Sequence, residues 1–181
     1  MKALLKTPKI GHFRLFFLLV TTLCLSACGF HLRGQYQLPS PLFRLFIQTS
    51  DPYDPFIQRL EQVLTKMNVV LVPTAKDAKV VLVVLSLTSG QNLVSSSTTS
   101  QVNTYALSYT LGFSLASPTG KVLIGPESVS ASQNYTISSS QAISGSSQEQ
   151  QLNGQLYQDV IYQLFNQLSS KKVKDALSQY A

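Results

Sequence analysis

The 181-residue sequence is poor in the side chains that carry most enzyme and metal chemistry. It holds two cysteines, two histidines and no tryptophan, and charged residues make up 12% of the chain. Metal sites draw ligands from clusters of cysteine, histidine and carboxylate residues, and the sequence shows neither such a cluster nor a glycine-rich phosphate-binding loop. We therefore expect no catalytic residue, no metal and no cofactor, and we do not expect an enzyme.

No apolar run reaches the roughly 20 residues that a membrane-spanning helix needs. The apolar run at Leu15–Leu25 has 11 residues. Four basic residues precede it, namely Lys2, Lys6, Lys9 and Arg14. A basic segment followed by a short apolar segment is typical of an export signal, so residues 1–27 are predicted to be a signal peptide that is removed.

The signal ends in the sequence Leu-Ser-Ala-Cys, from Leu25 to Cys28, which has the pattern of a lipobox. The small Ala27 before the cut admits the backbone to a peptidase, and the Cys28 thiol is nucleophilic enough to take a diacylglyceryl group. The new amino terminus can then take a further acyl chain. Cys28 is therefore the predicted lipidation site. The alternative is a secreted protein that is cut nearby and keeps Cys28 as a free thiol.

Removing the signal leaves few charges and no free thiol. Four of the 14 basic residues are lost with residues 1–27, which leaves 10 basic and 8 acidic residues. This balance is too weakly basic to indicate a nucleic-acid partner. Because Cys24 is lost and Cys28 is lipidated, the folded part must be stabilised by a packed core and not by a disulfide.

Lipid chemistry predicts the location. One acyl chain binds a membrane only marginally, whereas two or three chains on Cys28 would hold the protein essentially permanently. In bacteria with two membranes an aspartate after the lipidated cysteine favours the inner membrane, and this chain has Gly29 there. We therefore expect lipid anchoring at the outer membrane, facing the periplasm by default.

The mature chain divides into three parts. Residues 28–42 contain Gly34, Pro39 and Pro41 and predict an extended lipidated tether. Residues 43–170 predict a single domain, and residues 171–181 a carboxyl-terminal tail.

Within the domain, strand and helix patterns alternate. Residues 43–49 predict a strand, and the next helix should begin at Asp54 and Pro55 and end near Asn68. Strands are predicted at 80–88, 104–116 and 121–137, and an apolar stripe at helical spacing from 152 to 168 predicts the last helix. The order β-α-β-β-β-α predicts an α/β (α+β) two-layer sandwich, with two helices packed on one face of a small mixed β-sheet. The predicted core contains Leu60, Val63, Leu64, Leu107, Leu111, Phe113, Leu156, Ile161 and Leu164.

Four local features of this pattern are conditional or allow two interpretations. The first strand and the strand at 80–88 should be parallel if they share a sheet, because a helix connects them. Residues 69–72 fit either a short strand or a link. The serine-rich segment 89–101 predicts a hairpin loop or frayed strand ends, and Pro126 predicts a bulge or a sheet edge.

The second half of the chain is polar but nearly uncharged. Between Lys79 and Lys171 the only basic residue is Lys121, and the acidic residues are Glu127, Glu149 and Asp159. A solvated surface usually carries more charge. A surface of hydroxyls and amides suits an enclosed polar environment such as a barrel lumen, although compositional drift would leave the same pattern.

The mature chain opens with Cys-Gly-Phe-His-Leu-Arg-Gly, from Cys28 to Gly34, and this segment resembles the start of mature LptE, the LPS-assembly lipoprotein family also called RlpB. The order of elements over residues 43–170 is similar too. The resemblance implies an outer-membrane lipoprotein that plugs the LptD β-barrel as a heterodimer and assists its assembly. The pair would form the translocon that inserts lipopolysaccharide into the outer leaflet.

The resemblance also implies that lipopolysaccharide is bound, through basic residues in the sheet region. Here the sequence departs from the family, because Lys121 is the only cation from Val80 to Ser170. Lys121 is therefore the one candidate lipopolysaccharide-binding residue. The neutral segments 95–101 and 128–140 are predicted to face the barrel, with Ser130 and Ser132 as the candidate contacts.

Two other classes of protein stay open. One is an outer-membrane lipoprotein that binds another periplasmic or cell-wall partner. The other is an enzyme on a lipid tether, for which Asp51 and Asp54 would be the available carboxylate pair. Helix capping explains Asp54 better than catalysis does.

Overall fold

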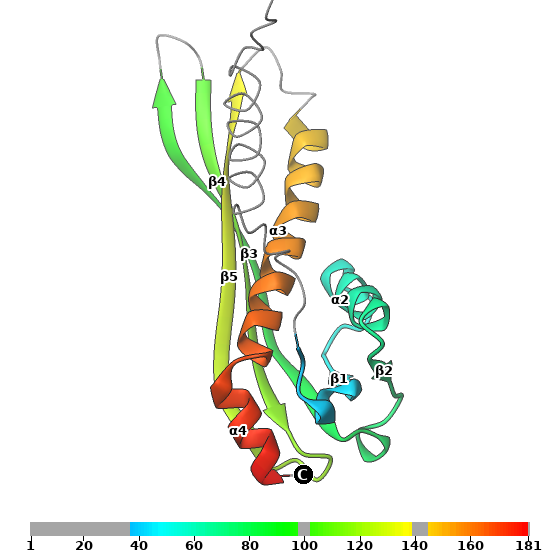
Figure 1. The fold of residues 1–181 in the computed structure, drawn as a ribbon. Helices are drawn as coiled ribbons and strands as arrows, with labels where there is room; N and C mark the ends of the chain where they lie inside the picture. Colours follow the sequence, from blue (N-terminus) through cyan, green and yellow to red (C-terminus); the bar gives the residue numbers. More distant parts are fainter. Residues whose placement is uncertain (1–36, 98–101, 139–144, 181) are drawn as a thin grey trace, which may run out of the picture. The chain divides into compact units, whose positions relative to one another are not determined.

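The computed structural model describes residues 37–97, 102–138 and 145–180 (Figure 1). The elements follow the chain in the order η1 (Ser40–Phe43), β1 (Arg44–Gln48), α2 (Pro55–Lys66), β2 (Val70–Leu71), η2 (Ala75–Asp77), β3 (Val80–Ser97), β4 (Val102–Ala116), β5 (Val122–Ser138), α3 (Gly145–Leu168) and α4 (Lys171–Tyr180).

Five strands form one sheet in the order β2-β1-β3-β4-β5. β1 runs parallel to β2 and β3, whereas β4 is antiparallel to both of its neighbours. The expected parallel pair is therefore confirmed, and Val70–Leu71 is a short strand rather than only a link. The expected bulge is also confirmed, because the β4–β5 register shifts beside Pro126.

The last three strands are much longer than the first two. β3, β4 and β5 have 18, 15 and 17 residues, whereas β1 has five and pairs only with residues 80–83 of β3. The three long strands therefore continue past β1 as a three-stranded ribbon. We call residues 86–97, 102–112 and 128–138 the distal ribbon.

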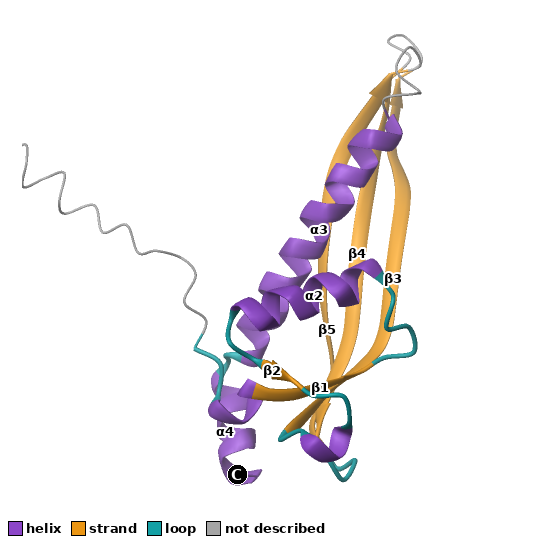
Figure 2. Ribbon diagram, turned by 90° about the vertical axis from the view of Figure 1, so that its right-hand side faces the viewer, coloured by secondary structure: helices purple, strands orange, loops and turns teal. Residues whose placement is uncertain are grey.

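Helices α2, α3 and α4 lie on one face of the sheet (Figure 2). On β4 the odd-numbered residues from Leu107 to Leu115 are buried on the helix side, and the even-numbered residues from Thr104 to Gly112 are half-buried on the other side. This alternation is the period of a strand with one covered face. The two-layer α+β architecture is confirmed, with α4 as a third helix. No helix in the described segments is long and apolar enough to cross a membrane.

The core lies between the helices and the sheet. Its largest fully buried side chains are Phe56, Phe113, Phe165, Leu42, Leu45, Ile57, Leu60, Leu64, Leu82, Leu111, Leu115 and Leu156. Every predicted core residue belongs to this cluster except Val63, which is partly buried and packs against it.

Helix α2 begins and ends as predicted because both ends are fixed locally. The Asp54 carboxylate accepts a hydrogen bond from the Phe56 amide at 2.7 Å, which satisfies a donor that the first turn leaves unpaired. At the other end Asn68 has φ 62°, a left-handed conformation that asparagine tolerates and that stops the helix.

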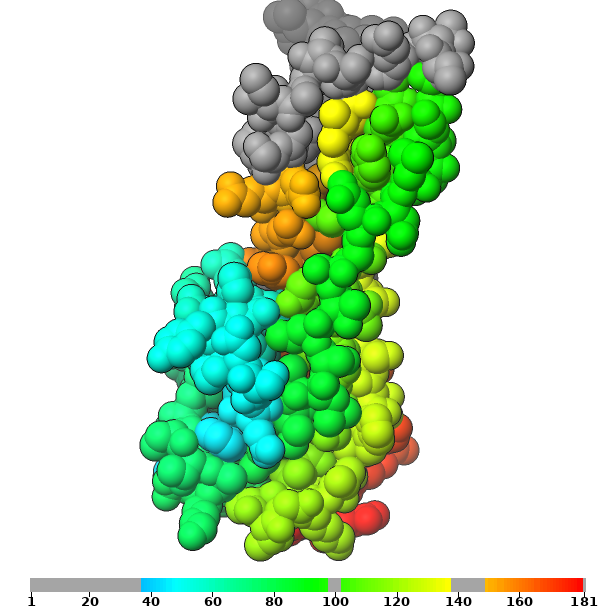
Figure 3. Space-filling view, turned by 180° about the vertical axis from the view of Figure 1, so that it is seen from behind, coloured from blue at the N-terminus to red at the C-terminus, as the bar shows by residue number. Residues whose placement is uncertain are grey.

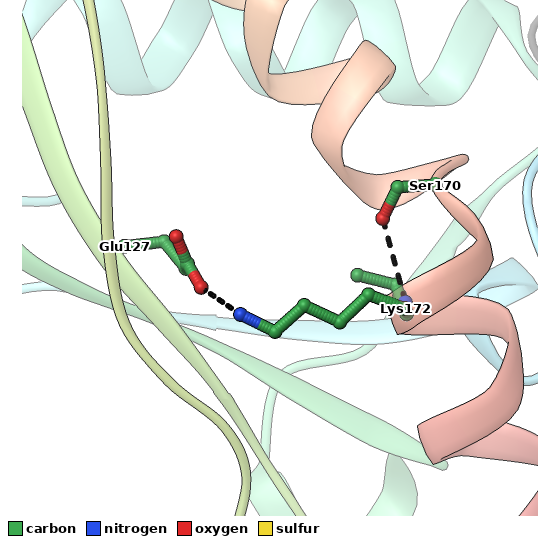
Figure 4. Close-up of polar contacts among 4 residues, drawn as sticks. Glu127, Ser170 and Lys172 are labelled. Carbon is green, nitrogen blue, oxygen red and sulfur yellow. Dashed lines mark hydrogen bonds and ion pairs between the residues drawn. The ribbon is translucent and has the colours of Figure 1, made fainter.

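Residues 171–180, which the sequence pattern assigns to a tail, form helix α4. Val173 and Leu177 lie four residues apart on one face and are buried in the core. Lys172 forms an ion pair with Glu127 of β5, and the Val173 amide donates to Ser170 Oγ at 3.4 Å (Figure 4). The buried apolar pair supplies most of the attachment, since an exposed ion pair contributes at most about 1 kcal/mol.

Two stretches that were expected to be irregular are ordered. Leu38 and Leu42, within the predicted tether, are 7% and 1% exposed and belong to the core. The serine-rich segment 89–97 is part of β3, with Ser97 opposite Val102 of β4. Pairing along the whole of β4 overrides the weak strand preference of these serines, since strand propensity depends strongly on context.

Candidate partner-binding surface

The distal ribbon has one face that no described element covers (Figure 3). Its residues stand in rows across the three strands, so that Thr88, Thr110 and Ser130 are neighbours in register. We call this the open face. It comprises Ser86, Thr88, Gly90, Asn92 and Ser95 of β3, Thr104, Ala106, Ser108, Thr110 and Gly112 of β4, and Ser128, Ser130, Ser132, Asn134 and Thr136 of β5.

None of the open-face side chains carries a charge. Thr104 Oγ1 and Thr136 Oγ1 share a hydrogen bond at 3.4 Å, and Ser108 Oγ donates to the Gly90 carbonyl at 3.3 Å. A hydroxyl can donate once and accept twice, so these groups retain capacity for a partner or for water. The open face can therefore be buried against another polar surface without removing an ion from water.

The neutral surface continues around the edge of β5 into a shallow groove of about 420 Å³. The groove is lined by Ser128, Val129 and Ser130 of β5 and by Gln163, Asn166 and Gln167 of α3. The three α3 residues are not among the contacts predicted from the sequence. Their spacing of three and four places them on one helix side, and this amide-rich side is the signal that would have identified them.

The structure brings some of the predicted site residues together and separates others. Ser130 and Ser132 are exposed on the open face. Lys121 lies in the turn between β4 and β5, where its amide donates to Ser117 Oγ at 3.0 Å. The β5 segment between Lys121 and Ser130 spans about 30 Å, so these residues cannot share one small site. Cys28 and the predicted contact segments 98–101 and 139–140 lie outside the described residues.

The groups with clearly perturbed pKa values are tyrosines of the core side. The Tyr109 ring packs 5.3 Å from Phe56 and 4.8 Å from Tyr157, centroid to centroid. Burial raises the pKa of both Tyr109 and Tyr157, and the nearby Asp54 carboxylate raises it further. Both phenols stay protonated at neutral pH and act as packing groups. Among the described residues no three histidine, cysteine or carboxylate side chains cluster as a metal site would require.

Sequence comparison places this domain among known proteins. Residues 44–168 match the family described as LptE: Lipopolysaccharide-assembly. The LPS-assembly lipoprotein LptE of Yersinia enterocolitica is 40% identical over 60 residues, which are 32% of this chain and 29% of that protein. The LptE of Yersinia pestis strain Pestoides F is 39% identical over 56 residues, covering 31% and 27% of the two chains. The matched segment thus spans less than a third of these relatives.

Solved structures share the fold at lower identity. The crystal structure of a minor lipoprotein from Acinetobacter baumannii has a TM-score of 0.60 at 23% identity, over 71% of this chain and 91% of that one. The solution structure of lipoprotein B from Nitrosomonas europaea has a TM-score of 0.63 at 20% identity, over 78% and 90%. The crystal structure of rare lipoprotein B from Shewanella oneidensis has a TM-score of 0.51 at 20% identity, over 75% of this chain and 95% of that one.

Proposed function

The chain belongs to the LptE lipopolysaccharide-assembly family, and we propose that it is an outer-membrane lipoprotein, anchored through Cys28, that forms a heterodimer with an LptD β-barrel. In this role it enters the barrel lumen as a plug and assists barrel assembly. The pair inserts lipopolysaccharide into the outer leaflet. The observation that carries the proposal is the uncharged open face of the distal ribbon.

The physical argument rests on the cost of burial. The interior wall of an outer-membrane barrel is polar, and hydroxyls and amides can share hydrogen bonds with it or with trapped water. A charged face would lose its hydration on entering the lumen, and an unpaired ion pays a much larger penalty than a hydroxyl.

The length of the ribbon supports the same conclusion. At about 3.3 Å per residue, the β3 segment from Ser86 to Ser97 extends about 40 Å. The apolar band of an outer-membrane barrel is about 25 Å tall. The distal ribbon is therefore long enough to run the full depth of a lumen.

The test places a single charge on the open face. Ser130→Lys and Ser132→Asp should each weaken the complex with the barrel at least about tenfold, because each buries an unpaired ion. Gln58→Lys is the matched control, since Gln58 is exposed on α2, away from the open face. Pull-down in mild detergent measures binding, and thermal unfolding shows that each variant is folded. Serine variants that hold the barrel as tightly as the unmodified protein contradict the proposal, and recovery of a different periplasmic protein favours the alternative partner.

Direct lipopolysaccharide binding is a second candidate, favoured by the position of Lys121. Lys121 is exposed in the turn beside Pro118, and Pro118 shares a surface hollow with the exposed Lys79. Two cations can engage the phosphates of lipid A. Lys121→Glu should then lower lipopolysaccharide binding and leave the barrel complex intact.

A further inference from the structure

Four of the described cations lie at the end opposite the distal ribbon. Arg44, Lys79 and Lys121 follow one another across the sheet end, since the Lys79 amide donates to the Arg44 carbonyl at 2.9 Å and Lys79 shares a hollow with the β4–β5 turn. We call these three residues and Lys76 of η2 the base surface. All four side chains are exposed.

Acidic residues only partly offset this charge. Asp77 lies within the base surface, where its backbone carbonyl accepts from Arg44 Nε and its carboxylate accepts from Thr74 Oγ1 at 2.6 Å. By contrast the described parts of the distal ribbon and of α3 carry no cation, and their only charged residues are Glu149 and Asp159. Apart from the base surface and Asp77, the described residues hold five basic and seven acidic side chains, so the base surface is a net positive region of the domain.

Apolar groups surround the cations. A hollow of about 470 Å³ at the base is lined by Ser40, Pro41, Ala78, Lys79, Pro118 and Tyr180. Tyr180 is 39% exposed, and Val122, which follows Lys121, is 58% exposed. Aromatic and basic side chains together are the composition that favours the interface between a membrane and water.

The chain from the predicted lipid anchor arrives at this same hollow. Ser40 and Pro41 line it, and Ser40 lies twelve positions after Cys28 in the sequence. A fully extended chain of that length reaches about 40 Å. If Cys28 is lipidated, Ser40 at the edge of this hollow therefore lies no more than about 40 Å of chain from the membrane surface.

We propose that the base surface docks the domain onto the anionic phospholipid headgroups of the leaflet that holds Cys28. The inference rests on the lipid anchor of the proposed function. Each basic residue near an anionic surface changes the ratio of docked to free molecules about fivefold. The uncharged open face has no such attraction, so docking sets the orientation of the domain and leaves the open face available to the barrel.

The test uses the mature lipidated protein in vesicles of phosphatidylcholine, with or without phosphatidylglycerol. With Cys28 lipidated, Val122→Cys provides a single thiol for a fluorophore at the base, and Val94→Cys provides one in the distal ribbon at a similar exposure of 57%. A nitroxide on the lipid headgroup quenches nearby fluorophores. Phosphatidylglycerol should increase quenching of the base label and leave the distal label unchanged.

Charge reversal supplies the matched comparison. Lys79→Glu with Lys121→Glu should lower the docked-to-free ratio at least about 25-fold, at about fivefold for each cation removed. Arg59→Glu with Lys66→Glu makes the same change in net charge on exposed residues of α2 and should leave quenching intact. Equal loss in both double variants would overturn the proposal, because net charge alone would then explain the effect.

Three further outcomes are decisive. In the first, inorganic phosphate reverses the quenching of the base label more strongly than chloride does at the same ionic strength. That result would indicate a discrete anion site and overturn docking on a headgroup layer. Protein that stays on the vesicles but shows equal quenching with and without phosphatidylglycerol overturns docking alone. Protein that leaves both vesicle types overturns the lipid anchor, and with it both the anchored part of the proposed function and this inference.

Discussion

The assignment of the two sheet faces can be tested by truncating one buried side chain, Leu111. Leu111 is 0% exposed and stands in register between Leu87 of β3 and Val129 of β5. Leu→Ala substitutions in cores cost about 2–5 kcal/mol, with the larger values where the surroundings cannot collapse into the cavity. Here a paired strand on each side holds the backbone in place. We therefore expect Leu111→Ala to lower the free energy of unfolding by about 3–4 kcal/mol.

The neighbouring residue provides the control. Thr110 precedes Leu111 on the same strand but belongs to the open face, so Thr110→Ala should cost less than about 1 kcal/mol, the scale of strand propensity. Both variants are measured by urea unfolding of residues 29–181 made without lipid, which we expect to be soluble and to unfold cooperatively because the core lies wholly within them. If the unfolding free energy falls with urea concentration at the same slope in each variant as in the unmodified protein, only stability has changed. A loss below about 0.5 kcal/mol for Leu111→Ala, the size of an ordinary surface effect, would refute the face assignment.

Three further predictions follow from other parts of the chain. Cys28→Ala should abolish labelling by a clickable fatty acid, and equal labelling of the variant would exclude Cys28 as the lipid site. Asp54→Ala should lower stability by about 1 kcal/mol, because the Phe56 amide loses its capping acceptor; an unchanged melting temperature would contradict this. Burial raises the pKa of Tyr109 above its ordinary value, so its contribution to stability is complete below about pH 10 and declines above it, where the unfolded chain ionises first. Tyr109→Phe should flatten that alkaline decline in unfolding free energy, and an identical pH profile would show that the burial of the phenol has no such effect.

Local patterns in the sequence account for most of the fold. The start of α2 follows from Asp54, whose carboxylate caps the helix within two residues of sequence. The covered face of β4 follows from its strict alternation, and the parallel pairing of β1 with β3 follows from the helix between them. Helix α4 was missed because its buried residues, Val173 and Leu177, lie among lysines that look like the end of the preceding helix.

The base surface could not be predicted because its members meet only through strand register. Arg44, Lys79 and Lys121 belong to three different parts of the chain, and no spacing rule links them. Their proximity depends on the pairing of β1 with β3 and of β3 with β4. The scarcity of charge on the open face, by contrast, is a property of composition and is visible in the sequence.

The edge of the sheet connects these features. β5 is the last strand of the sheet, and from Ser128 to Ser138 it contains neither a charged residue nor a proline. Proteins usually protect such edges with charges, prolines or bulges, because an unpaired strand invites association with other chains. In β5 these protections, Pro126 and Glu127, lie only at the base end. A barrel wall around the distal ribbon would enclose both this edge and the open face, whereas the base surface, with its cations, would stay at the membrane surface where charge is hydrated.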